Sequence, residues 1–179
     1  MKMVNILVIL TLLAGLSSAQ EIAQTPNASV AKDLLTTVRA DRSLGFFDSA
    51  ITSSGMAKML NEKGPFTVFA LSDHAFANLS KDDLGTLLAN PSVMHVLLAH
   101  YIVRGAITKD DTASLLSAKT LAGVDLRTDV RSEGTYVNGA KLSQSEIRCT
   151  NGMIHVLDSL DPGLVHDAVA LAIASRRGK

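Results

Sequence analysis

The spacing of the apolar residues changes near Asp111, and this change limits what the chain can fold into. Before it, apolar residues recur every three or four positions, as in Val30, Leu34 and Val38, which is the pattern of one helix face. After it, apolar and polar residues alternate with the two-residue period of a strand. The alternating residues are Leu121, Val124, Leu126, Val130, Val137, Leu142 and Ile147. We therefore expect helices in the first half and a β-rich second half.

Strands are also expected within the helical half. Gly64-Pro65 ends the helical pattern, and Phe66 to Ala70 is a run of β-branched and aromatic residues typical of a buried strand. Ser72 and Ser80 are each suited to cap a short helix that follows them. A further helix then leads into a second short strand, which we expect at Tyr101 to Val103.

Two Asn-Gly pairs, Asn138-Gly139 and Asn151-Gly152, indicate hairpins in the second half. Each pair lies between apolar-alternating segments, and Asn-Gly accepts the positive φ angles of a tight turn. On the strand between the turns, Ile147 lies on one face. Glu146 and Arg148 lie on the other face, which we expect to be wet.

The N-terminus has the layout of a secretory signal peptide. Lys2 precedes the eleven-residue apolar run Ile6 to Leu16, and small residues follow up to Ala19. The run is too short for a mature membrane span, which needs about 20 residues. We expect residues 1–19 to be removed and residues 20–28 to form a polar leader. An uncleaved anchor or a buried helix is the alternative.

Composition argues against nucleic acid as a partner. Residues 1–19 hold one lysine and no acid, so their removal leaves 160 residues with 16 basic and 17 acidic side chains. A formal charge of −1 gives no broad attraction to phosphates, and tryptophan is absent. Cys149 is the single cysteine, so no internal disulfide can form, and we favour an inert, buried thiol over a reactive one.

The histidines do not form a metal or catalytic pattern. No two of them have the i, i+4 spacing of a helical zinc pair. The sequence also lacks a nucleophile elbow, a phosphate-binding loop and a dinucleotide fingerprint. We therefore expect no metal, no cofactor and no catalysis, and we interpret His155 as a hydrogen-bonded structural residue. The five histidines are His74, His95, His100, His155 and His166.

Three segments together resemble the fasciclin-domain family. Gly64 to Leu79, with its Thr-Val-Phe-Ala strand, resembles the first signature of the family. Asn151 to Asp158 resembles the second signature, an Asn-Gly turn followed by an Ile-His-Val strand. Leu97 to Gly105 is similar to the central Tyr-His segment. The resemblance spans about Ala31 to Pro162.

The resemblance implies the fold and the domain limits. We expect an α+β domain over residues 29–162, built as a fasciclin-like wedge of two packed β-sheets with helices along one side. Residues 163–179 would follow it as a C-terminal helical tail, which we expect to pack on the domain more readily than on a partner or a membrane surface.

The resemblance also supplies candidate partner-binding residues. An Asp-Ile pair before the Asn-Gly turn is associated with integrin binding in animal members, and Glu146 and Ile147 match it here. His100 and Tyr101 match the central pair in reversed order, and Leu71 replaces the usual proline of the first signature. The alternative is that Ile147, His100 and Tyr101 are core residues. Because the chain departs from the family pattern at these positions, we do not predict integrin binding.

The implied function is a non-enzymatic adhesion or binding module, secreted or held at the cell envelope. Its partner would be a matrix, envelope or cell-surface protein. An extracellular small-molecule or lipid-binding protein with an apolar cleft is the first alternative, and a hydrolase built on His155 or His74 is the second. Asn27 and Asn78 begin Asn-x-Ser sequons and are candidate glycosylation sites.

Overall fold

The first half of the described chain is mostly helical, as its apolar spacing predicts. The computed structural model describes residues 32–114 and 117–177, which belong to one compact unit. This unit opens with α1 (Leu34–Ala40), α2 (Gly45–Ser53), α3 (Ala57–Leu60) and strand β1 (Phe66–Leu71). Then come α4 (Asp73–Ala77), α5 (Lys81–Leu88), α6 (Pro91–Ala99) and strand β2 (Ile102–Arg104).

Strands dominate the second half, which confirms the change in pattern. Its elements are α7 (Lys109–Ser114), β3 (Ser117–Lys119), β4 (Asp125–Arg131), β5 (Gly134–Val137), β6 (Ala140–Cys149), β7 (Gly152–Leu157) and α8 (Pro162–Arg177). Helix α7 was not expected, because its sequence Lys-Asp-Asp-Thr-Ala-Ser carries no apolar periodicity.

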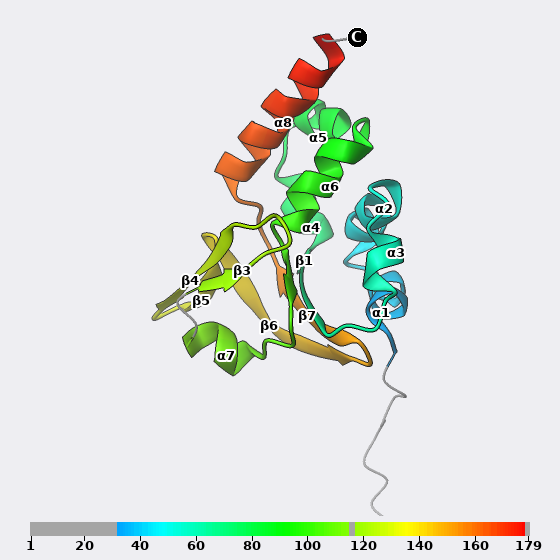
Figure 1. The fold of residues 1–179 in the computed structure, drawn as a ribbon. Coiled ribbons are helices and arrows are strands. Elements are labelled where there is room, and N and C mark those ends of the chain that lie inside the picture. The colour runs from blue at the N-terminus through cyan, green and yellow to red at the C-terminus, as the bar shows by residue number, and fades with distance from the viewer. Residues whose placement is uncertain (1–31, 115–116, 178–179) are drawn as a thin grey trace, which may run out of the picture. The chain divides into compact units, whose positions relative to one another are not determined.

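The strands form one mixed sheet, so the expectation of two packed sheets is wrong while the α+β class is confirmed. The strand order is β2-β1-β7-β6-β5-β4-β3. Strand β1 runs parallel to β7 and antiparallel to β2, and the remaining described pairs are antiparallel. Figure 1 shows α7 beside β4 and β6, away from the other helices, so the helices do not all lie along one side.

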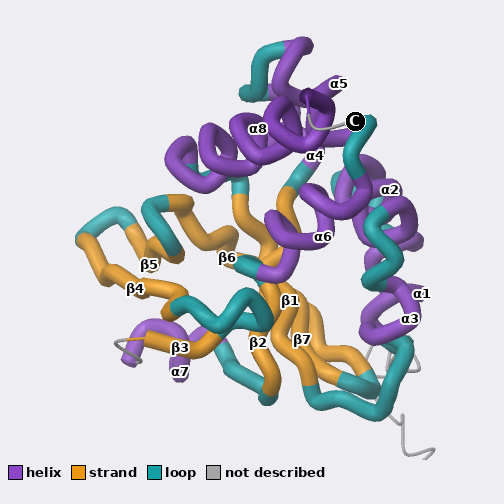
Figure 2. Tube along the Cα trace, turned by 45° about the horizontal axis from the view of Figure 1, so that its top comes forward, coloured by secondary structure: helices purple, strands orange, loops and turns teal. Residues whose placement is uncertain are grey.

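The sheet curls because β6 is shared between its two parts, the β7 side and the β5 side. This ten-residue strand pairs with β5 at one end and β7 at the other, and its register with β7 shifts between Leu142 and Glu146. Such an irregularity bends a strand and increases its twist. The outer strands then approach each other: Val103 bridges Thr120, and the Leu121 N–H donates to the Ile102 carbonyl at 2.8 Å. Figure 2 shows β2 and β3 side by side at this closure.

A single apolar core joins the helices to the sheet. Phe69 of β1 and Val156 of β7 are 1% and 9% exposed and belong to one cluster of buried residues. Phe47 of α2 and Phe76 of α4 are also fully buried. Each large apolar side chain buried in this way stabilises the fold by about 2 kcal/mol.

The helix caps confirm the expected helix starts. The Ser72 side chain accepts a hydrogen bond from the Ala75 N–H, and the Ser80 side chain accepts one from the Asp83 N–H. Each serine satisfies a backbone donor that the first helical turn leaves unpaired.

Both Asn-Gly pairs lie in hairpins, but they act differently. Asn138 and Gly139 have φ angles of 48° and 80° and form the expected tight turn between β5 and β6. The second turn consists of Thr150 and Asn151, and Gly152 is already the first residue of β7, paired with Cys149. Among the described non-glycine residues Asn138 alone has a positive φ, so the second pair does not adopt the turn that we expected.

The two ends of the chain differ in how far the structure describes them. The expected signal peptide over residues 1–19 and the expected leader over residues 20–28 lie outside the described residues. Helix α8 packs on α5 and α6, with Val165, Ala168 and Ala172 buried. Within the described residues, no helix is both long enough and apolar enough to cross a bilayer.

Candidate binding surface around the β6 to β7 turn

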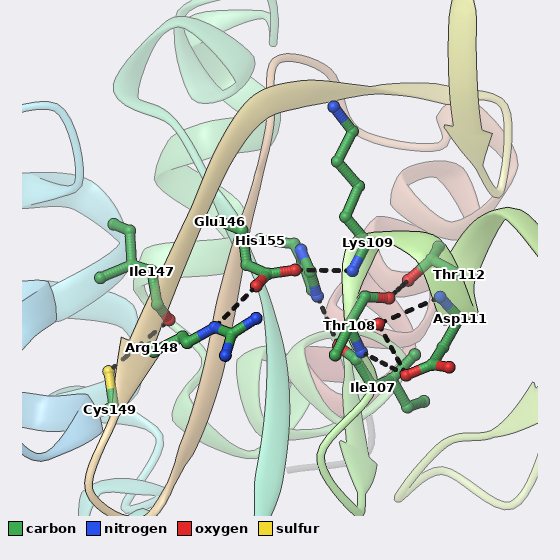
Figure 3. A network of polar contacts seen from close by, with 10 residues as sticks. All are labelled: Ile107, Thr108, Lys109, Asp111, Thr112, Glu146, Ile147, Arg148, Cys149 and His155. Atoms are coloured by element: carbon green, nitrogen blue, oxygen red, sulfur yellow. Dashed lines mark hydrogen bonds and ion pairs between the residues drawn. The ribbon is translucent and has the colours of Figure 1, made fainter.

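Glu146 connects β6 to the first turn of α7. Its Oε2 accepts a hydrogen bond from the Lys109 backbone N–H at 2.6 Å, and its Oε1 accepts one from the Arg148 Nε–H at 3.1 Å (Figure 3). Lys109 begins α7, where backbone donors lack helical partners. The Lys109 N–H is the main reason that the pKa of Glu146 is lowered, and Arg148 contributes further. We expected the Glu146 face of β6 to be exposed to solvent. Glu146 is instead half-buried, because α7 lies over it.

His155 lies opposite Glu146 on β7 and is fully buried. Its Nε2 is 2.7 Å from the Ile107 carbonyl oxygen, which can only accept, so Nε2 carries the hydrogen. Its ring stacks on Phe69 at a centroid distance of 5.4 Å, and Nδ1 has no hydrogen-bond partner among the described residues. The interpretation of His155 as a hydrogen-bonded structural residue is confirmed.

The segment before α7 is fixed against β1. The Thr67 hydroxyl donates to the Gly105 carbonyl at 2.7 Å and accepts from the Ile107 N–H at 2.8 Å. Thr108 and Asp111 then exchange side-chain to backbone hydrogen bonds, which caps α7. The Ile107 carbonyl that His155 contacts is thus fixed by the Thr67 hydroxyl on one side and by the cap of α7 on the other.

An open hollow of about 770 Å³ lies beside the β6 to β7 turn. Its rim carries side chains of both charges, with Asp33 and Glu62 against Lys63 and Arg148. The Arg148 side chain is 78% exposed, and its guanidinium is oriented by Glu146. The hollow therefore combines polar and apolar surface, with charged side chains of both signs at its rim.

Cys149 lines the same hollow but has the properties of a structural thiol. Its Sγ is 3.4 Å from the Thr37 hydroxyl, and burial raises the pKa of the thiol. A raised pKa keeps the sulfur protonated and unreactive at neutral pH.

Ile147 points away from Glu146, on the opposite face of β6 (Figure 3). It pairs with the buried Ile154 and packs partly against the core. It also lines a smaller hollow of about 360 Å³ together with Ser72, His74 and Asp158. The two residues matched to the integrin-associated pair therefore do not form one continuous contact surface.

His100 and Tyr101 lie elsewhere, at the end of α6. Tyr101 is fully buried, its hydroxyl accepts from the Asp161 N–H at 3.1 Å, and burial raises its pKa to about 12. His100 is half-buried, with Nδ1 2.7 Å from the Val96 carbonyl oxygen. The core alternative is confirmed for Tyr101, whose hydroxyl is directed at the start of α8 and not at the β6 to β7 turn.

The remaining candidates are placed as follows. Asn78 is exposed at the C-terminal end of α4, and Asn27 lies outside the described residues. Within residues 32–114 and 117–177, no three His, Cys, Asp or Glu side chains converge as a metal site would require. A cleft of about 490 Å³ between α4, α5 and α8 has the apolar lining of Leu79, Leu160 and Val169.

Comparison with known proteins decides the family. The family model described as Fasciclin domain matches residues 43–160, well over half of the chain. The chain belongs to the fasciclin domain family. This family is non-catalytic, so the expectation that the chain is not an enzyme is confirmed.

Relatives of this fasciclin domain differ widely in length. The uncharacterized protein sll1735 of Synechocystis is 33% identical over 112 residues, which cover 63% of this chain and 84% of that protein. Protein sll1483 of Synechocystis is 32% identical over 114 residues and 63% of each chain. The pig transforming growth factor-beta-induced protein ig-h3 is 29% identical over 113 residues, which are 63% of this chain but 16% of that protein.

A solved structure shows the same fold. The domain pair of the insect cell adhesion molecule Fasciclin I superposes with a TM-score of 0.64 at 17% identity. The match covers 75% of this chain and 52% of that chain.

Asn151 of the fasciclin domain has a role that sequence reasoning missed. Its side chain accepts from the Leu34 N–H at 2.9 Å and donates to the Leu60 and Glu62 carbonyls at 2.8 and 3.3 Å. One amide thus ties the start of α1 and the end of α3 to the β6 to β7 turn. The Asn-Gly motif indicated a turn at this position, but nothing local to it signals partners some ninety or more residues away.

The Glu146 contacts predict a pH dependence of stability. Because the folded pKa of Glu146 is lowered, its contribution is present above the unfolded pKa and is lost as the pH falls through the folded pKa. Replacing Glu146→Gln should therefore cost about 1 kcal/mol at neutral pH. The cost should shrink in urea unfolding curves as the pH falls below the ordinary pKa of glutamate, about 4.3. A cost at Glu146 that stays constant with pH would refute the assignment.

Proposed function

We propose that this fasciclin domain is a non-catalytic, exported binding module that joins a cell or its envelope to a matrix or surface protein. The proposed contact surface is the hollow beside the β6 to β7 turn, centred on Arg148 and Lys63. The observation that carries the proposal is a concave surface with a charged rim, beside a turn that the Asn151 side chain ties to the helices of a non-catalytic domain.

Rigidity of the rim supports this assignment. Glu146 holds the Arg148 guanidinium at 3.1 Å, and Asn151 fixes the turn and the segment that leads to Glu62 and Lys63. Groups held in place before binding lose little conformational entropy when a partner arrives. Charges of both signs on one rim also favour a partner with a complementary pattern over a wrong one.

The four residues matched to the family enter the proposal in unequal ways. Glu146 acts by orienting α7 and the neighbouring Arg148, which makes the exposed contact. Ile147 and Tyr101 support the core from other faces, and His100, held at the Val96 carbonyl, lies outside the proposed surface. The layout of residues 1–19 supports export, and the cell adhesion molecule with the same fold supports a role in attachment.

Charge reversal at the rim tests the proposed surface. The exported chain is titrated against matrix, envelope and cell-surface fractions, with its N-terminus identified by mass. Replacing Arg148→Glu should weaken binding by about tenfold or more, since a rim charge would then oppose its partner. The matched control Arg131→Glu changes an exposed arginine on β4 and should bind as the parent does. Equal binding by both variants, or a chain that keeps residues 1–19 inside the cell, would contradict the proposal.

A second candidate rests on the apolar cleft between α4, α5 and α8. Its volume of about 490 Å³ is within the range of small-molecule sites, and Leu79, Leu160 and Val169 supply an apolar lining. Native mass spectrometry of the purified chain tests this candidate. A small ligand that survives purification would favour it over protein binding.

A further inference from the structure

Helix α7 and the residue that caps it form one wall of the hollow beside the β6 to β7 turn. The cap residue Thr108 lines the hollow together with Arg148 and Met153. Figure 1 shows α7 apart from the other helices, beside β4 and β6. We call residues 108–114 the α7 wall. Because Thr108 belongs to both the wall and the hollow, a displacement of the wall changes the width of the hollow.

The α7 wall has little apolar surface with which to pack on the sheet. Residues 108–114 contain no valine, leucine, isoleucine, methionine or aromatic residue. Thr112 is buried, but its hydroxyl donates to the Thr108 carbonyl at 2.8 Å, within the wall itself. A segment that is attached mainly through polar contacts opens at a lower free energy than one attached by buried apolar side chains.

Ile107, the residue before the wall, is fixed to the sheet through both of its backbone polar groups. Its N–H donates to the Thr67 hydroxyl at 2.8 Å, and its carbonyl oxygen lies 2.7 Å from Nε2 of the buried His155. Its side chain also packs partly against the core. The chain up to Ile107 is therefore held by β1 and β7, and Ile107 is the point at which the wall can hinge.

Glu146 holds the wall just beyond this hinge. Its Oε2 accepts from the Lys109 N–H at 2.6 Å, and its Oε1 accepts from the Arg148 Nε–H at 3.1 Å, so that Glu146 lies between the two (Figure 3). Hydrogen bonds to a carboxylate are stronger than those between neutral groups. Because each partner has its own oxygen, loss of the Lys109 contact leaves the Arg148 contact in place. The wall can thus detach while Arg148 keeps its orientation.

Detachment would also unfold α7. The helix has six residues, which is too short to be stable in water without tertiary contacts. The hydrogen bonds between Thr108 and Asp111 satisfy only its first turn. The open state is therefore one in which the backbone amides of residues 109–114 are exposed to solvent.

We propose that the α7 wall is a lid that hinges at Ile107 and is kept closed by Glu146, so that the hollow exists in a narrow closed form and a wide open form. The consequence for binding rests on the proposed function, because the lid regulates access to the same hollow. A partner that contacts Thr108 and Arg148 together binds the closed form and thereby holds α7 in place.

Hydrogen exchange of the free chain at low urea concentrations tests the lid without any partner. Relative to their unfolded rates, the amides of residues 109–114 should exchange about 100-fold faster than those of β7. Their rate should hardly change with urea, because local opening exposes little surface. Equal protection and equal urea dependence in the two segments overturn the proposal, since α7 would then open only when the whole domain unfolds.

Glu146→Gln tests the contact that keeps the lid closed. A neutral amide oxygen replaces the carboxylate that accepts from Lys109, so exchange in residues 109–114 should become about fivefold faster. The control Glu62→Gln makes the same chemical change at an exposed glutamate on the hollow, and α7 should exchange there as in the parent. An unchanged rate in the Glu146 variant, or an equal rise in the control, contradicts the assignment. Failure of the binding surface, shown by Arg148→Glu, would leave these exchange rates as they are, so the two failures are distinguishable.

Discussion

Replacing Gly152→Ala should destabilise the domain by about 4 kcal/mol or prevent folding, the largest effect that we expect from a single methyl group. A Cβ at Gly152 would lie 2.0 Å from the Phe66 carbonyl oxygen, which belongs to the parallel neighbour β1. Gly152 also has a φ of 156°, which side chains rarely adopt. Relief would require separating β1 from β7 at the start of their parallel ladder, where both are interior strands of the sheet. Urea unfolding measures the loss.

Gly139→Ala is the matched control for this prediction. Gly139 has a φ of 80° in the other Asn-Gly hairpin, and no atom lies within 4 Å of the position that a Cβ would take there. It should therefore cost about 1 kcal/mol through backbone conformation alone. Equal costs at the two glycines would show that the approach of β1 to β7 is not as close as the structure has it.

Replacing Asn151→Ala should cost about 3 kcal/mol, the second large effect. The change removes one acceptor and one donor group that serve the Leu34 N–H and the Leu60 and Glu62 carbonyls. The contacts with Leu34 and Leu60 are partly buried, so leaving these two backbone groups unpaired carries a desolvation penalty, whereas the exposed Glu62 carbonyl can turn to water. The measurement is again the free energy of unfolding in urea.

Two further variants separate the contributions of the Asn151 amide. Asn151→Asp keeps the acceptor for the Leu34 N–H but loses the donor to Leu60, so its cost should be intermediate. The exposed Asn61→Ala lies on the same hollow and should cost less than about 0.5 kcal/mol. A small effect of Asn151→Ala would mean that the segments it joins hold together without it.

Local signals in the sequence predicted the individual elements well. The strand at Phe66, the helix caps at Ser72 and Ser80 and the hairpin at Asn138 each depend on a few neighbouring residues, and all are confirmed. The two-residue alternation around Ile147 also predicted which residues share a face of β6. These features follow from backbone preferences and periodicity, which one sequence contains.

The closure of the sheet depends on contacts that no local pattern encodes. Two sheets were expected, and one sheet forms because the register of β6 shifts between Leu142 and Glu146 and lets the strand serve both halves. The partial burial of Glu146 also depends on a contact between distant segments, because α7 lies over this residue. The sequence of α7 has no apolar periodicity, so neither the helix nor its contact could be predicted. The candidate surface changed accordingly, from Glu146 and Ile147 to Arg148 and the hollow beside it.

Site-specific crosslinking on intact cells tests the central claim most directly. A photoreactive residue is placed at Lys63 on the hollow, and in a second chain at Val130 on β4, before the exported chains are added to cells and irradiated. The account predicts that the Lys63 chain captures a discrete surface or matrix protein, that Arg148→Glu abolishes the capture, and that the Val130 chain captures none. Capture of the same protein from both positions, or undiminished capture by the Arg148→Glu chain, would contradict it.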